Sequence, residues 1–128
     1  MRDVAKVVRD YLLTVSGVTA LAGTRIYAER TYPPRGWTAS SGSTIVFKQR
    51  GGDLPYHAQQ LNASLMFKCY GATEVAANAL YQALFEAMQD AVSGNLLSSQ
   101  CEVLGQTLEE PSLDWVFVLT YFRVVVRR

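Results

Sequence analysis

Apolar and polar residues follow two different periodicities in the middle of the chain. Over residues 61–70 they alternate, which is typical of a strand with one buried face, and over residues 74–92 the apolar residues recur at helical spacing. Between the two, Gly71 has the backbone freedom that a tight turn needs, and Thr73 is a good N-cap with Glu74 in the first helical turn. The pattern predicts a strand, a turn and an amphipathic helix that packs on a sheet.

The same periodicities predict further elements on both sides of this unit. These are a helix at 3–13, a turn with a short helical corner at 15–23, and strands at 25–30, 43–50, 101–108 and 113–127. Residues 31–42 and 51–60, which contain Gly, Pro and polar side chains, are expected to be flexible loops. We therefore expect a single α+β domain over residues 1–128: a mostly antiparallel sheet of about four to five strands, with two main helices on one face, in the order α-β-β-β-α-β-β.

The last predicted strand is apolar on both faces. Trp115, Phe117 and Tyr121 alternate with Val116 and Val118, so both sides of this strand favour burial. Two helices can cover only one face of a small sheet. The other face requires either the long loops of the same chain or further copies of the chain, and we favour copies, because an exposed aromatic patch promotes aggregation.

The predicted central helix carries a second apolar column beside its core-facing stripe. Tyr81 and Phe85 form this column with Val92, and we expect the first helix to cover most of it, a neighbouring subunit being the alternative. A polar row lies along the outer side of the helix. The candidate subunit interface combines this helix with the last strand and comprises Glu74, Asn78, Tyr81, Gln82, Phe85, Trp115, Phe117 and Tyr121.

Charge is distributed unevenly along the sequence although the formal net charge is only +1. Between Cys69 and Phe122 there is no Lys or Arg, and all seven charged residues there are acidic; the rest of the chain holds all 12 Lys and Arg. Both signs could interleave on the folded surface. Alternatively, the subunit is bipolar, and its acidic side meets the basic side of a neighbour, as head-to-tail rings and filaments require.

Residue patterns for catalysis are absent from the sequence. There is no nucleophile elbow, phosphate-binding loop, dinucleotide-binding loop or metalloprotease motif, and His57 has no metal ligand at suitable spacing. We therefore expect no enzymatic activity, no cofactor and no metal. Cys69 and Cys101 are expected to be free thiols, and no apolar run approaches the ~20 residues of a membrane span, so a soluble protein made in the cytoplasm is expected.

Four segments, in order, resemble the tail terminator family of long-tailed bacteriophages, also called tail-completion or head–tail joining proteins. They are VSGVTALAGTRIYAER, TIVFKQRGGD, LMFKCYGATEVAANALYQAL and the closing WVFVLTYFRVVVR. The resemblance covers nearly the whole chain. It implies a structural virion protein of the neck region, assembled in the host cytoplasm, six copies of which form a ring that caps the tail tube and joins it to the head.

The resemblance also implies partners and contact sites. The implied partners are other copies in a hexamer, the major tail tube protein and the head connector or stopper protein, while DNA passes through the ring without being read. Loops of the subunit would contact the tube or the neck, which makes Trp37, Asp53, Leu54, Tyr56 and His57 the candidate contact residues. The alternatives are another neck component, either a stopper or a connector adaptor, and a small nucleic-acid-binding α+β domain.

Overall fold

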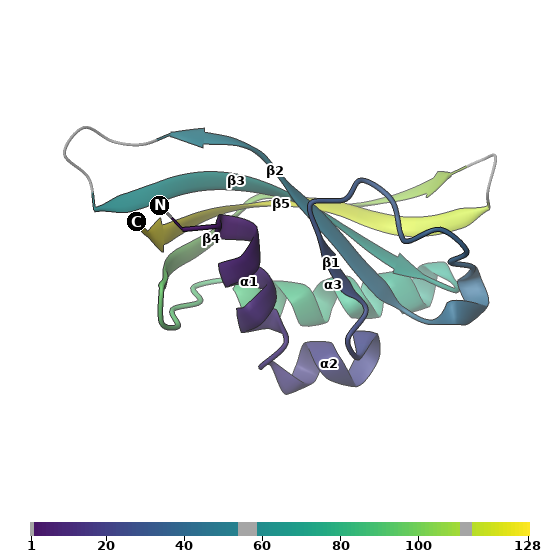
Figure 1. Ribbon diagram of the computed structural model, residues 1–128. Coiled ribbons are helices and arrows are strands. Elements are labelled where there is room, and N and C mark those ends of the chain that lie inside the picture. The colour runs from purple at the N-terminus through teal and green to yellow at the C-terminus, as the bar shows by residue number, and fades with distance from the viewer. Residues whose placement is uncertain (1, 54–58, 111–113) are drawn as a thin grey trace.

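The computed structural model describes residues 2–53, 59–110 and 114–128. It contains three α-helices, a short 3-10 helix and five strands, and all three α-helices lie on one face of the sheet (Figure 1). In chain order the elements are α1 (Val4–Leu12), α2 (Ser16–Ala22), β1 (Ile26–Ala28), η1 (Ala39–Ser41), β2 (Thr44–Asp53), β3 (Gln60–Gly71), α3 (Glu74–Met88), β4 (Leu96–Glu110) and β5 (Trp115–Arg127).

The five strands form one sheet in the order β1-β2-β3-β5-β4, so β1 and β4 are its edges. β1 pairs with β2 in parallel, and all other neighbours are antiparallel. Gln60 lies opposite Arg127 and Gly71 lies opposite Val116. The ends of β2 and β3 at Asp53 and Gln60 are therefore at the opposite end of the sheet from the ends of β4 and β5 at Glu110 and Trp115 (Figure 1). The predicted α+β class and the mostly antiparallel sheet are confirmed.

The main core lies between the sheet and the helices. In β3 the alternation is confirmed, with every second side chain from Leu61 to Cys69 buried on the helix side. The N-cap is confirmed too, because the Thr73 side chain accepts a hydrogen bond from the Ala76 amide at 3.2 Å. On α3 the buried residues are Ala77, Leu80, Leu84, Ala87 and Met88.

Three boundaries differ from the sequence-based prediction. The predicted corner at 15–23 contains the complete helix α2, and β2 continues to Asp53, which shortens the loop expected at 51–60. β4 begins five residues early, at Leu96, although residues 98–100 are polar. This start is stabilised by the end of α3, because the Asp90 amide donates to the Ser99 carbonyl at 2.9 Å and the Cys101 amide donates to Gln89 Oε1 at 2.8 Å.

The loop between β1 and β2 covers part of the sheet face that the helices leave open. Trp37 is only 7% exposed and packs with Val46, Tyr70 and Phe117 in a second apolar cluster. Its indole N–H donates to Thr44 Oγ1 at 2.8 Å. The expectation that Trp37 is exposed for contact with a partner is therefore wrong: at this end of the sheet the chain covers its own open face.

No helix of the described residues is long and apolar enough to cross a membrane. Cys69 is buried and Cys101 is partly buried, and both are free thiols, as predicted. Burial raises the pKa of the Cys69 thiol far above its usual value, so this thiol stays protonated and unreactive and serves to fill the core.

Candidate subunit interface

The outer side of α3 is open to solvent. Glu74 and Gln82 are exposed and Asn78 is partly exposed, and together with Val75 and Ala79 they line a shallow hollow along the helix. Val75 is 80% exposed, which is unusual for a large apolar residue on a helix. The structure thus brings the predicted polar row together on one accessible surface that also contains apolar area.

Tyr81 and Phe85 point from α3 toward β4 and β5 rather than toward the first helix. The Tyr81 hydroxyl accepts a hydrogen bond from the Gly105 amide at 2.8 Å, and the Phe85 ring lies 6.2 Å from that of Phe122. The expectation that the first helix covers this column is wrong. α1 instead packs near β1 and β2 and reaches α3 through Tyr11, whose hydroxyl donates to the Ala87 carbonyl at 2.5 Å.

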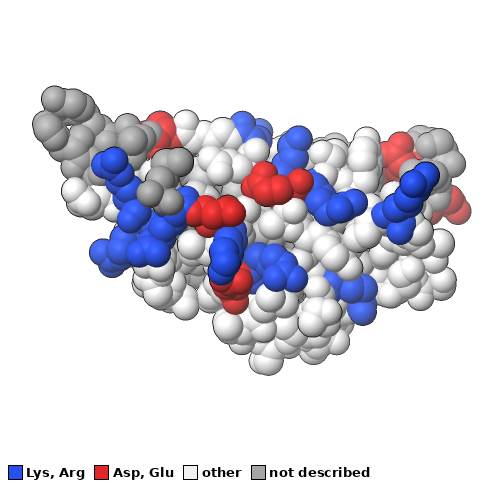
Figure 2. Space-filling view, viewed as in Figure 1, with Lys and Arg blue, Asp and Glu red and all other residues white. Residues whose placement is uncertain are grey.

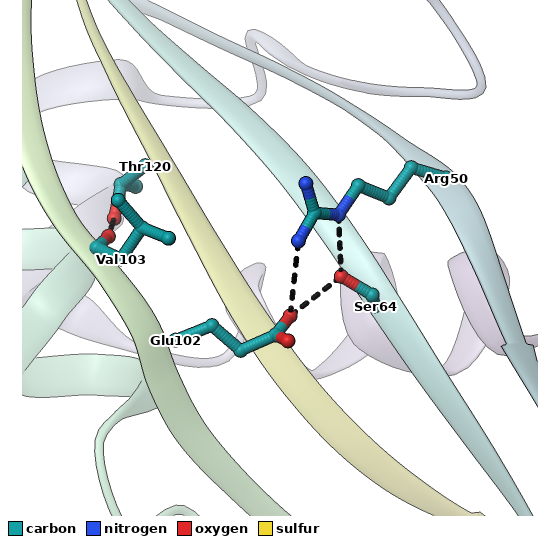
Figure 3. A network of polar contacts seen from close by, with 5 residues as sticks. All are labelled: Arg50, Ser64, Glu102, Val103 and Thr120. Carbon is teal, nitrogen blue, oxygen red and sulfur yellow. Dashed lines mark hydrogen bonds and ion pairs between the residues drawn. The ribbon is translucent and has the colours of Figure 1, made fainter.

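A β-bulge in the edge strand β4 lies beside Tyr81. Val103 is opposite Tyr121 and Gln106 is opposite Leu119, so β4 has one extra residue in this stretch. The Thr120 hydroxyl fixes the bulge by donating to the Val103 carbonyl at 2.7 Å (Figure 3). The bulge leaves Val103 47% and Leu104 70% exposed.

Gly105 belongs to the same bulge, and any larger residue there would force neighbouring side chains to shift. A Cβ at this position would be 2.6 Å from the Tyr81 ring and 2.7 Å from Val118 Cγ1. The exposed apolar residues Val103 and Leu104 beside it were not predicted from the sequence. The signal that could have revealed it is the isolated glycine within an otherwise continuous strand pattern.

The three candidate interface residues of β5 have partners within their own subunit. Phe117 is 6% exposed beneath the Trp37 cluster, and Trp115 meets Trp37 edge to face with ring centroids 5.1 Å apart. The guanidinium of Arg50 lies 4.0 Å above the centre of the Tyr121 ring. The loop and the polar side chains thus cover much of the face that was expected to require another copy.

A polar network crosses the remainder of the open face. Arg50 Nε donates to Ser64 Oγ at 2.8 Å, and Ser64 donates to Glu102 Oε1 at 2.5 Å, so β2, β3 and β4 are linked across β5 (Figure 3). Nearby, Arg123 on β5 pairs with Asp53 at 3.1 Å. Each exposed pair contributes roughly 0–1 kcal/mol. The network fixes the spacing of the strands rather than supplying much stability.

Lys68 on this face and Glu109 at its rim are among the ionisable groups with perturbed pKa values. Burial lowers the pKa of Lys68, although Glu110 opposes that effect; Lys68 lies 4.7 Å above the centre of the Tyr32 ring. At the β4–β5 end, a hydrogen bond with Asp114 and the charge of that carboxylate raise the pKa of Glu109. The protonated form of Glu109 is thus favoured by a hydrogen bond to Asp114 and by the repulsion between the two carboxylates at a solvent-exposed rim.

The predicted loop contacts lie mostly outside the described residues. Leu54, Tyr56 and His57 belong to that part of the chain, and Asp53 is exposed at the end of β2. Among residues 2–53, 59–110 and 114–128, no group of three or more His, Cys, Asp or Glu side chains could hold a metal ion.

Folding converts the uneven charge along the sequence into an uneven charge across the molecule. The segment without Lys or Arg forms α3, β4 and part of β5, whereas α1, β1 and β2 belong to the basic part of the chain. β1 and β4 are the two edges of the sheet, so the basic and the acidic segments each supply one edge strand, while α3 packs mainly on β3 and β5. Figure 2 shows Lys and Arg side chains spread over the face where α1 and β1 lie, with some Asp and Glu side chains between them.

No protein-family model and no curated protein matches this chain. Among solved structures, it is similar to a chain in a structure described as "Virion of native gene transfer agent (GTA) particle", with a TM-score of 0.64 and 17% sequence identity. The likeness covers 94% of this chain and 92% of that chain. At this level of identity the likeness shows a shared fold over nearly the whole length of both chains.

Proposed function

We propose that this chain is a structural protein of a phage-like virion, specifically a tail terminator that forms a ring at the end of the tail tube. The observation that carries the proposal is the shared fold with a chain of a gene transfer agent virion, which extends over nearly the whole of both chains. The order of the four sequence segments supports the same assignment independently of the fold.

The surface of the subunit is consistent with a structural role. Its distinctive features are an exposed helix face, an exposed apolar bulge on an edge strand and an uneven distribution of charge between the segments that form the two sheet edges. Features of this kind suit protein–protein contact. In the proposed ring, the exposed side of α3 faces a neighbouring copy, and the end of the sheet that holds Asp53 faces the tube or the neck.

Binding of purified chain to purified partners tests the proposal. A tail terminator should bind assembled tubes of its cognate major tail protein and should block their further elongation, as followed by electron microscopy of tube lengths. Binding to the portal or connector protein without any binding to tubes would assign the chain to another neck component. Tight binding to short DNA duplexes that weakens steeply with salt would instead favour a nucleic-acid-binding domain.

A further inference from the structure

We propose that neighbouring copies dock head to tail, with the α3–β4 flank of one copy against the α1–β1 flank of the next. The α3–β4 flank is defined as α3 residues 74–86 together with β4 residues 102–107. The α1–β1 flank is defined as α1 together with residues 25–35. This inference rests on the proposed ring and specifies which two surfaces form it.

Charge is the first argument for a second copy as the partner. The α3–β4 flank contains Glu74 and Glu86 on the exposed side of α3 and Glu102 on β4, of which Glu102 pairs with Arg50 at 4.0 Å. The sequence from Tyr70 to Tyr121 contains no Lys or Arg. The α1–β1 flank carries Lys6, Arg9, Arg25, Arg30 and Arg35 against Asp10 and Glu29. Each copy thus provides both members of a complementary pair, and two like flanks repel each other.

Apolar area is the second argument. Leu104 is 70% exposed and Val75 is 80% exposed, and both belong to the α3–β4 flank. The backbone of the bulge that presents Leu104 is held by Thr120 on one side and by Tyr81 on the other, so the position of this residue is set before any partner arrives. A pre-positioned apolar residue within a charged surround matches the usual anatomy of a protein–protein interface.

The backbone at both edges is partly closed to strand addition. On β1, the Arg9 side chain donates to the Ile26 carbonyl at 2.7 Å. On β4, groups from α3 and from the turn that follows it bond the backbone at Ser99, Cys101 and Gly105. Side chains rather than a continuous sheet should therefore join neighbouring copies.

The positions of the two flanks determine the type of assembly. Their strands β1 and β4 are the opposite edges of one sheet, so the contact joins two different surfaces and leaves one of each free on every dimer. Such a heterologous contact closes into a ring or continues as a filament, and it cannot stop at a symmetric dimer.

A mixing experiment with two blocked variants tests the inference. Leu104→Arg blocks the α3–β4 flank, and the double substitution Arg30→Glu with Arg35→Glu blocks the α1–β1 flank. Each variant alone should sediment as a monomer at concentrations where the wild-type chain forms rings. Mixed in equal amounts, the two should form a dimer and nothing larger, because only one working flank of each kind meets. Val92→Arg is the matched control: Val92 is 72% exposed and lies outside the defined flank, so this variant should still form rings.

Other results would overturn the inference in distinguishable ways. Rings formed by Leu104→Arg as readily as by the wild type would show that copies meet elsewhere, and the proposed function would survive. Loss of binding to tail tubes without loss of self-association would show that this flank binds the tube protein. Circular dichroism must show that the variants are folded. A wild-type chain that stays monomeric both alone and on tail tubes would overturn the proposed ring itself.

Discussion

Replacing Trp37 by alanine tests whether the loop before β2 belongs to the core of the subunit or to a partner site. Trp37 is 7% exposed and lies edge to face against Tyr70 and Trp115, with ring centroids 5.5 and 5.1 Å away. It also donates a hydrogen bond to Thr44 Oγ1. Substitution of a buried Trp by Ala costs about 3–5 kcal/mol. The cluster lies at the surface of the sheet, so we expect the lower limit, about 3 kcal/mol.

Urea denaturation followed by circular dichroism measures this loss. With a denaturant slope of about 2 kcal/mol per molar urea, the midpoint of unfolding should fall by roughly 1.5 M. Tyr32→Ala is the control, because Tyr32 is 52% exposed and contributes mainly a cation–π contact with Lys68, worth about 0.5–1 kcal/mol. Trp37→Ala and Tyr32→Ala variants of equal stability would refute the reasoning, and a simultaneous loss of partner binding would make Trp37 a contact residue after all.

Three further predictions concern the bulge, the acidic rim and the assembly. Gly105→Ala should destabilise the fold by about 1–3 kcal/mol in thermal unfolding, because the new Cβ overlaps the Tyr81 ring; an unchanged melting temperature would contradict the bulge geometry. Asp114→Asn should lower the pKa of Glu109 toward its ordinary value, as measured by NMR titration. It should also raise stability at neutral pH, because the two carboxylates of the wild-type pair are ionised there and repel each other. An unchanged pKa of Glu109 would show that Asp114 does not cause the shift. If opposite charges join the copies, rings should dissociate as salt rises from 0.05 to about 0.5 M, whereas assembly that ignores salt would show that apolar contacts dominate.

The central strand and helix could be predicted because each buries one face. Burial on one side produces a period of two in β3 and a period near 3.6 in α3, and both periods are visible in the sequence. The hydrophobic pattern thus determined the core between the sheet and α3. The position of Thr73 gave the helix start, since a side-chain cap is a local feature.

Long-range packing explains what the sequence did not reveal. Trp37 lies in a loop with two prolines, and nothing in that loop shows that it folds back over Tyr70 and Phe117. Phe85 repeats at helical spacing, but only the sheet order shows that β4 and β5, rather than the first helix, lie beside it. Leu104 appeared to be an ordinary strand residue because a bulge changes the alternation without changing the composition.

The most direct test of the account is cryo-electron microscopy of the purified chain with assembled tail tubes. We predict closed rings of this chain, six copies in each, seated at one end of the tubes, with α3 of each copy against α1 and β1 of its neighbour. Tubes with bare ends beside a chain that remains monomeric would contradict it.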